Sequence, residues 1–416
     1  MSCTLERGKE TVELSRAKAE VRLSRAFVFV MQDMPDGGQN QHQEVVWSRI
    51  LQRFQEETLN LNNRNADGLC HRFRIINKDV KLWDVVLAEV VEKEPLEISN
   101  PPNGGDYTAT NRPWIVKTVG FYDESCPQVE DIIYEELVKK ISPIPRNITI
   151  PGILRLFFHD CYVQGCDGSV LILPTDANNS ERNTSINLSL AGDAFDIVDK
   201  AKAALEKECP GVVSCSDILA ILARDVVHWW EGPHWQVEKG RKDGLISNAT
   251  EAQLLMPKSD ENITTLIRGF ESIGLSTADL VTLSGAHTIG FTHCIEFASR
   301  IFHNDTTLNS TIREKVILSC PFPKIDRNVA EALDQNSEFV FDNKFYKSLR
   351  QGKGLLLTDH VLAFGENDLS RKLVYRYSQD QELFFQEFAK AMVKLGRVGV
   401  KTRNEGEIRR DCKKFN

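Results

Sequence analysis

The chain has 416 residues, a formal net charge of −8 and an isoelectric point near 5.7. This acidic balance argues against a basic nucleic-acid-binding surface over the whole chain, and the absence of any run of about 20 apolar residues excludes a transmembrane helix. The length predicts about two or three domains, and an apolar content of 41% is normal for a soluble globular chain.

The first quarter of the chain differs in character from the rest. Val46, Ile50 and Phe54 recur at helical spacing within a polar, charge-dense segment. We therefore predict an N-terminal extension over 1–98, which is either a small helical module or an artefact of gene prediction. The stretch AFVFVM is too short for a signal peptide and follows charges of both signs, so no export signal is recognised. The segment SNPPNGGDYTATNRP at 99–113 predicts a linker, and 114–416 form the main domain.

The main domain is predicted to be all-α. Apolar residues recur at helical spacing between segments rich in Pro and Gly, and strand-like alternation is scarce. Ser276 and Asp279 form a capping-box pattern at the start of one helix. The expected helices span 128–140, 191–208, 216–230, 263–273, 277–287, 292–300 and 383–395.

The stretch GILRLFFHDCYV is almost continuously apolar but carries Arg155 and His159. In a helix, residues four apart share a face. Burying a cation costs several kcal/mol unless a partner compensates it. Two such groups on one buried face indicate a functional site, provided that a partner is found elsewhere in the chain.

His287 is the candidate partner, because it ends the apolar stripe of Leu280 and Leu283 beside glycines that permit close approach. A lone histidine on such a face is more often a satisfied core residue than a ligand. A haem placed between this histidine and the first pair would explain both, since haem iron takes an imidazole on one side and needs donors and a base on the other.

Cysteines and glycosylation sequons point to the compartment. Cys3 and Cys70 lie in the first quarter, and eight more cysteines follow residue 112. Eight is compatible with four disulfides formed in an oxidising compartment, and buried free thiols are the alternative. Asn-x-Ser/Thr sequons matter only in the secretory route, and none precedes residue 112. The sequons are at Asn147, Asn178, Asn183, Asn187, Asn248, Asn262, Asn304 and Asn309.

Several motifs follow one another in an order that resembles a known family. They are FYDESCPQVEDII, GILRLFFHDCYVQGCDGSVLI, ECPGVVSCSDILAILARDVV, GPHWQVEKGRKDG, DLVTLSGAHTIGFTHC and FDNKFY. Together they resemble the secretory plant (class III) haem peroxidases over 118–416. The resemblance implies a haem peroxidase fold, in which distal and proximal helical halves sandwich one haem b. The extension, through WSRI and NKDV, is weakly similar to plant Myb/SANT-like modules.

By this resemblance, His159 is the distal base that moves a proton between the two oxygens of hydrogen peroxide. Arg155 stabilises the charge that develops on the leaving oxygen, and Phe158 forms a wall of the distal pocket. Asn187 fixes the His159 imidazole through a hydrogen bond. Because Asn187 also lies in a sequon, this role requires it to be buried and unglycosylated.

The proximal side follows from the same resemblance. His287 is the axial iron ligand, and Asp359 accepts its N–H and so favours high oxidation states of the iron. His360 stands where the family usually has Gln. Pro257 corresponds to the mouth at which reducing aromatic substrates dock.

The resemblance also implies two calcium ions, which carboxylate, hydroxyl and carbonyl oxygens would bind as hard ligands. The distal set is Asp160, Val163, Gly165, Asp167 and Ser169, with Glu181 through water. The proximal set is Thr288, Asp334, Ser337, Val340 and Asp342.

Four disulfides are implied as well, in a pairing that spacing alone leaves open. They are Cys126–Cys209, Cys161–Cys166, Cys215–Cys412 and Cys294–Cys320.

The implied activity is the oxidation of phenolic or similar donors by hydrogen peroxide, in one-electron steps through a ferryl intermediate. It serves hydrogen peroxide removal and lignin-type oxidation. The expected protein is a glycosylated monomer, secreted to the cell wall or vacuolar, with small aromatic donors as partners and with nucleic acid involved only through the extension. One alternative function is a haem-fold or cell-wall-binding protein without catalytic activity. The other is a protein that binds DNA through 1–98. The complete set Arg155, His159, Asn187, His287 and Asp359 argues against the protein without catalytic activity.

Overall fold

A computed structural model describes residues 120–142, 148–303, 305–321, 325–326 and 328–416. The predicted extension over 1–98 with its Myb/SANT-like resemblance, the predicted linker over 99–113, Cys3, Cys70 and the sequons at Asn147 and Asn304 lie outside these residues.

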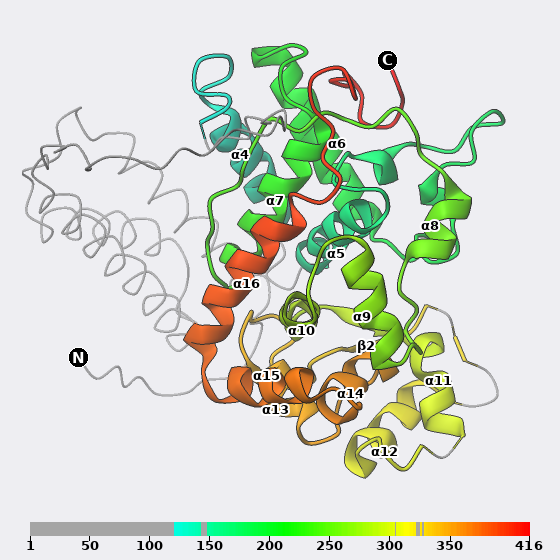
Figure 1. Ribbon diagram of the computed structural model, residues 1–416. Helices are drawn as coiled ribbons and strands as arrows, with labels where there is room; N and C mark the ends of the chain where they lie inside the picture. The colour runs from blue at the N-terminus through cyan, green and yellow to red at the C-terminus, as the bar shows by residue number, and fades with distance from the viewer. Residues whose placement is uncertain (1–119, 143–147, 304, 322–324, 327) are drawn as a thin grey trace, which may run out of the picture. The chain divides into compact units, whose positions relative to one another are not determined.

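The described part of the chain is mainly helical, as predicted (Figure 1). Its α-helices are α4 (Val129–Ile141), α5 (Thr149–Tyr162), α6 (Gly192–Glu208), α7 (Cys215–Trp229), α8 (Ala249–Leu255), α9 (Ile263–Ser272), α10 (Thr277–Ser284), α11 (Cys294–Phe302), α12 (Ser310–Ser319), α13 (Lys344–Leu349), α14 (Leu357–Phe364), α15 (Asp368–Gln379) and α16 (Gln381–Leu395).

Short elements complete the described chain. The 3-10 turns are η2 (Ser169–Leu171), η3 (Glu181–Asn183) and η4 (Gly285–Thr288). Strands β1 (Phe291–His293) and β2 (Ala330–Ala332) pair antiparallel, with Phe291 opposite Ala332. None of the helices within the described ranges is both long and apolar enough to cross a membrane.

Helix α7 is the central helix of the distal half. Every residue of 215–227 is buried, so this helix is covered on all sides, unlike the one-faced helices around it. Helices α4, α5 and α6 pack on it. The Ser214 hydroxyl caps its first turn by accepting a hydrogen bond from the Asp217 amide at 3.1 Å. The apolar face of α5 therefore lies against a fixed helix.

Aromatic side chains form the core of the proximal half. Phe341 and Phe388 meet edge to face with ring centroids 4.8 Å apart, and Tyr346 meets Phe384 in the same way at 5.0 Å. Helices α9, α15 and α16 pack on α10, while α13 and α14 pack on α15. The Tyr346 hydroxyl donates to the Val281 carbonyl at 2.9 Å, which ties α13 to α10 and satisfies the buried phenol.

The helix predicted over 277–287 is shorter than expected. The capping box of Ser276 and Asp279 is present, but α10 ends at Ser284 and the chain tightens into η4. A Cβ atom at Gly285 would lie 2.4 Å from the Tyr346 hydroxyl and 2.5 Å from Phe384. This close approach depends on side chains far along the sequence, so the sequence period of 277–287 did not reveal it.

The helix predicted over 292–300 begins later than expected, at Cys294. Residues 291–293 instead form β1, whose partner β2 lies far along the chain. Helices α8, α12, α13, α14 and α15 were not among the predicted helices. The other predicted helices agree with the structure within one or two residues at their ends, which is the usual uncertainty of helix boundaries.

Gly290 places η4 against the distal helix α5. This glycine has a φ of +94°, and a Cβ atom there would lie 2.9 Å from the Cβ of Pro151. The position therefore requires glycine both for its backbone conformation and for space. Since Pro151 lies in the first turn of α5, the segment that carries His287 lies close to the start of the helix that carries Arg155 and His159.

The structure contains four disulfides among the described residues. They are Cys126–Cys209, Cys161–Cys166, Cys215–Cys412 and Cys294–Cys320, the same pairs that the resemblance implies.

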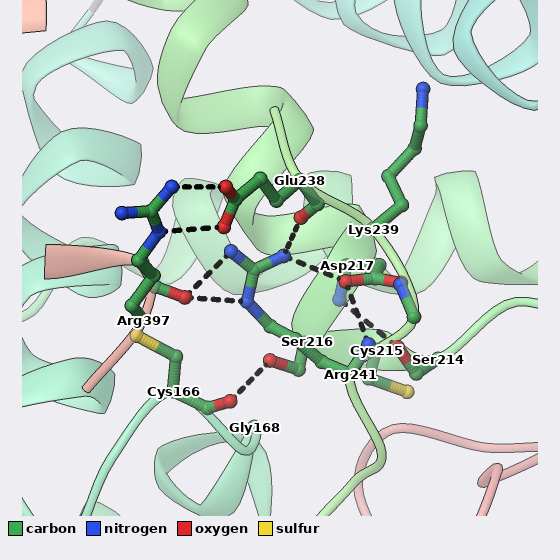
Figure 2. Close-up of polar contacts among 12 residues, drawn as sticks. Cys166, Gly168, Ser214, Cys215, Ser216, Asp217, Glu238, Lys239, Arg241 and Arg397 are labelled. Atoms are coloured by element: carbon green, nitrogen blue, oxygen red, sulfur yellow. Dashed lines mark hydrogen bonds and ion pairs between the residues drawn. The ribbon is translucent and has the colours of Figure 1, made fainter. Parts of the chain in front are cut away.

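A buried ion pair joins α7 to the segment that follows α16 (Figure 2). Arg241 Nη1 donates to Asp217 Oδ1 at 2.8 Å, and Arg241 Nη2 donates to the Gly396 carbonyl at 2.7 Å. The Tyr122 hydroxyl donates to Asp217 Oδ2 at 2.7 Å, so both carboxylate oxygens have partners. Burial and the charge of Asp217 raise the pKa of Tyr122, which remains a neutral donor.

We predict that Arg241→Met destabilises the protein by about 3 to 5 kcal/mol, because it leaves the Asp217 carboxylate buried without its cation. Urea unfolding with the disulfides intact measures this change. Arg397→Met is the matched control, since Arg397 pairs with Glu238 at the surface and its loss should change the unfolding free energy by less than about 1 kcal/mol. Equal effects of the two substitutions would contradict the prediction.

Candidate active site

Arg155 and His159 lie one turn apart on α5, and the loop after η3 supplies their partners. The His159 ring is buried, and its Nδ1 lies 2.7 Å from Asn187 Oδ1. Asn187 is also buried, and its Nδ2 donates to the Glu181 carbonyl at 2.9 Å. The amide of Asn187 is therefore engaged at both ends, as its predicted role requires. The sequence alone had left a surface loop as the alternative.

The Arg155 guanidinium is held by a residue that the sequence analysis did not identify. Arg155 Nη2 donates to Ser189 Oγ at 2.9 Å, and Arg155 Nη1 donates to the Ser189 carbonyl at 3.1 Å. Ser189 is the third residue of the Asn187 sequon, so its serine was noticed only as a glycosylation signal. A hydroxyl two residues after the asparagine that binds the His159 ring could have indicated this second role.

The contacts of His159 fix both its tautomer and its charge. Its Nδ1 donates to Asn187, while its Nε2 accepts a hydrogen bond from Arg155 Nε at 3.2 Å. Burial and the charge of Arg155 lower the pKa of His159 to about 3, against a smaller opposing effect of the Asn187 hydrogen bond. The ring is thus neutral near pH 7 and carries its lone pair on Nε2, which is the arrangement of a general base.

His287 has the opposite electrostatic environment. Its Nδ1 lies 2.8 Å from Asp359 Oδ1, and the second carboxylate oxygen of Asp359 is buried without a hydrogen-bond partner. Burial opposes protonation of His287, but the charge of Asp359 and its hydrogen bond outweigh this and raise the pKa of the ring. An imidazole that donates Nδ1–H to a carboxylate leaves a more basic Nε2, which is the nitrogen suited to binding a metal.

Arg155 connects the two histidines. Its charge lowers the pKa of His159 and also opposes protonation of His287. The Arg155 side chain is accessible to solvent, yet burial lowers the pKa of its guanidinium. The His287 side chain is 37% exposed, although burial opposes its charge as well. Both side chains therefore line an interior space, which fits a flat prosthetic group between the two histidines.

Phe158 lies beside the His159 ring. Phe158 packs edge to face on His159 with ring centroids 6.2 Å apart, and it also contacts Phe270 of α9 at 6.0 Å. Pro257 is half-buried in the segment between α8 and α9. Phe158 therefore limits the room beside the imidazole, as expected for a wall of the pocket.

The predicted distal calcium residues form a buried acidic group directly after α5. Burial raises the pKa of Asp160, Asp167 and Glu181, and the charge of Asp167 adds to this effect on Asp160 and Glu181. Ser169 Oγ and Glu181 Oε2 are buried without a hydrogen-bond partner. The charges of Arg409 and Lys401 oppose the effect of burial only in part, and buried carboxyl groups beside unsatisfied oxygens fit a divalent cation. Val163 and Gly165 would contribute main-chain carbonyls.

The predicted proximal calcium residues also come together. More of their side-chain oxygens form hydrogen bonds or ion pairs than in the distal group. Ser337 Oγ donates to Asp342 Oδ1 at 3.1 Å and lies 3.2 Å from Asp334 Oδ2, while Thr288 Oγ1 donates to Asp342 Oδ1 at 3.2 Å. Asp342 Oδ2 forms an ion pair with Lys344 Nζ at 3.0 Å. The hydroxyl groups would have to turn from donating to the carboxylates to binding the cation, with Val340 supplying its carbonyl.

Side-chain ligands alone would not complete either cation site. Within the ranges that the structure describes, no three His, Cys, Asp or Glu side chains come together as a metal-binding group. Hydroxyl and main-chain carbonyl oxygens must therefore supply part of each set, as they do for calcium rather than for zinc.

Comparisons with known proteins agree with this chemistry. A family model described as peroxidase matches residues 134–380. Peroxidase 41 of Arabidopsis thaliana is 43% identical over 300 residues, which cover 72% of this chain and 91% of the relative. Peroxidase 55 and Peroxidase 51 of the same plant are each 44% identical over 304 residues, covering 71% of this chain and 89% and 91% of the relatives. The range of the family model includes both histidines and their partners.

We predict that Asn187→Val releases the His159 ring from its single tautomer, because Nδ1 loses its acceptor. Imidazole ¹⁵N NMR of the protein without added cofactor should show one neutral tautomer in the wild type, protonated at Nδ1, and a mixture in the variant. Asn183→Val is the matched control, since Asn183 is exposed on η3 and bonds Asn179 instead. A single unchanged tautomer in Asn187→Val would show that Asn187 does not orient the ring.

Proposed function

This chain belongs to the plant peroxidase family, and we propose that its two histidine sets hold one haem b between them. The chain is a haem peroxidase that uses hydrogen peroxide to oxidise donors. The observation that carries the assignment of residues is the pair of histidines, each fixed through Nδ1, with the charge of Arg155 acting on both. We propose 114–416 as the peroxidase domain.

The bound haem supplies an iron that binds peroxide and accepts its oxidising equivalents. His287 Nε2 would hold that iron, and Asp359 keeps the ring oriented and electron-rich through the bond to Nδ1. Among the described residues, Asp359 alone forms a side-chain hydrogen bond to the His287 ring. Asp359 is nearly fully buried, so water does not compete for its bond to the ring.

His159 moves a proton within peroxide. Its Nε2 would accept a proton from one oxygen of peroxide and return it to the oxygen that leaves. In the structure this nitrogen accepts a hydrogen bond from Arg155 Nε. The Arg155 guanidinium therefore has to release His159 and donate to peroxide, where it stabilises the negative charge that develops as the O–O bond breaks. Ser189 keeps the guanidinium in place during this exchange through its contacts to Nη1 and Nη2.

We further propose phenolic or similar aromatic donors, oxidised in one-electron steps near Pro257, and calcium ions in both acidic groups. Four disulfides support an oxidising compartment, the cell wall or the vacuole, in keeping with the secretory branch of the family. Exposed sequon asparagines such as Asn183 and Asn262 are accessible to glycosylation, whereas Asn187 is buried. We propose a monomer.

Reconstitution with haemin and calcium tests the assignment. We expect a Soret band that shifts on addition of peroxide, together with peroxide-dependent oxidation of guaiacol. His159→Ala should keep the Soret band but lower turnover about a hundred- to ten-thousandfold, because the proton transfer loses its base. His287→Ala should change the haem spectrum itself, since the iron loses its axial ligand. A wild-type protein that binds haemin but shows no peroxide-dependent spectral change would refute the proposed function.

Chelation tests the calcium proposal. Removing the cation leaves Asp160, Asp167 and Glu181 buried near one another without a bound metal ion, so we expect EGTA to lower Tm by roughly 5 to 10 °C. Calcium should restore the original Tm and magnesium should not, because a set of ligands that includes main-chain carbonyl oxygens suits the larger calcium ion. Asp160→Asn should lower Tm and weaken the response to EGTA, whereas the exposed control Asp176→Asn should behave as the wild type. A Tm that is insensitive to EGTA would contradict calcium binding.

A further inference from the structure

An exposed carboxylate, Glu296, lies at the junction of three segments around the site. Glu296 is in the first turn of α11, and its Oε2 accepts a hydrogen bond from Ser259 Oγ at 2.8 Å. Ser259 follows Pro257 by two residues, and its carbonyl accepts a hydrogen bond from the Thr358 amide at 3.2 Å. The loop with Pro257, the start of α11 and the start of the helix that carries Asp359 therefore meet at Ser259.

Glu296 is close enough to Arg155 for the two charges to interact. The carboxylate favours the protonated guanidinium, in opposition to the effect of burial. The Glu296 carboxylate is therefore bonded to the loop that carries Pro257 and also acts electrostatically on Arg155. A donor that approaches Arg155 past Pro257 would meet this charge first.

The Glu296 carboxylate is available to a ligand. Its hydrogen bond to Ser259 uses Oε2 only, and among the described residues no cation forms an ion pair with it. The nearest arginine on its own helix, Arg300, instead pairs with Asp305 at 2.7 Å. Glu296 therefore presents a negative charge that no cation of the described residues neutralises by contact.

Exposed apolar side chains neighbour this charge along the chain. Leu254 and Leu255 end α8 just before Pro257 and are 77% and 47% exposed, and Ile295 next to Glu296 is 47% exposed. Apolar surface with one fixed charge suits an aromatic molecule that carries a charge of the opposite sign.

We propose that Glu296 is a specificity-determining residue, which forms an anionic subsite at the donor entrance and favours cationic over anionic aromatic donors. The proposal rests on the proposed function, because it requires donors to enter beside Pro257. Glu296 acts by charge: it attracts an ammonium group on the donor, leaves a neutral phenol unaffected and repels a carboxylate. Ser259 fixes the carboxylate in position through its hydroxyl.

Binding of aromatic probes that the enzyme does not oxidise tests the subsite independently of turnover. Calorimetry on the haem- and calcium-loaded full chain compares benzylamine, benzyl alcohol and benzoate, which carry positive, zero and negative charge at pH 7. In Glu296→Gln, the Kd of benzylamine should rise about two- to fivefold and the Kd of benzoate should fall by a similar factor, as for single exposed charge pairs. The Kd of benzyl alcohol should stay unchanged. Equal Kd changes for all three probes would overturn the proposal.

Turnover of a matched phenol series tests the consequence for catalysis. Tyramine, p-cresol and 4-hydroxyphenylacetate differ mainly in charge. The ratio of kcat/KM for tyramine over 4-hydroxyphenylacetate should fall about four- to 25-fold in Glu296→Gln, the product of two opposite charge effects. High salt should reduce the ratio in the wild type and leave the variant almost unchanged.

A second variant separates a local effect from a change in net charge. Glu314→Gln removes the same charge from an exposed position on α12. It should leave the ratio of kcat/KM for tyramine over 4-hydroxyphenylacetate unaltered. A wild type that oxidises p-cresol, with a tyramine ratio that is the same in Glu296→Gln, would refute the subsite alone. A wild type that oxidises none of the three phenols would refute the proposed function instead.

Discussion

The chemistry of this protein depends on one constraint: each histidine of the site is bound at Nδ1, which leaves Nε2 for reaction. Asn187 provides a neutral acceptor for His159, whereas Asp359 provides a charged one for His287. Two identical side chains acquire opposite properties, because burial and the charge of Arg155 lower the pKa of His159, whereas the charge of Asp359 and its hydrogen bond raise that of His287. The proposed base needs a neutral ring that can accept a proton, and the proposed iron ligand needs an electron-rich ring. The two hydrogen-bond acceptors fix which ring nitrogen is free, while burial and the neighbouring charges set the pKa of each ring.

The surroundings of these acceptors fix them in place. Asn187 is bound to the Glu181 carbonyl, and the Glu181 side chain belongs to the acidic group that follows α5. The Cys161–Cys166 disulfide lies in the same segment, directly after His159. On the proximal side, Thr288 follows His287 immediately and binds Asp342. Each proposed calcium group therefore lies one residue from a histidine of the site, so a cation bound there would also order the reacting rings.

The sequence was most informative where local pattern decides structure. The apolar period identified most of the long helices, and the spacing of Arg155 and His159 correctly placed two costly groups on one helix face. The sequence did not predict the structure where contacts between residues far apart in the chain determine it. Helix α10 ends early because Tyr346 and Phe384 approach Gly285, and β1 exists only because β2 returns to it. Ser189 was missed because its role depends on the loop after η3, which brings it to Arg155, and a serine is not unusual at the surface.

The connection between α7 and the end of the described chain bears on how the protein is made. Cys215 pairs with Cys412 across 197 residues, whereas Cys161 and Cys166 are only five residues apart. At typical elongation rates, about 10 to 40 s separate the synthesis of Cys215 from that of its partner. During this interval Cys215 must stay reduced while nearer cysteines oxidise around it. If cysteines paired in the order in which they are synthesised, Cys215 would form a disulfide with a wrong partner. Efficient maturation therefore requires a thiol–disulfide isomerase or a delay of oxidation until translation ends.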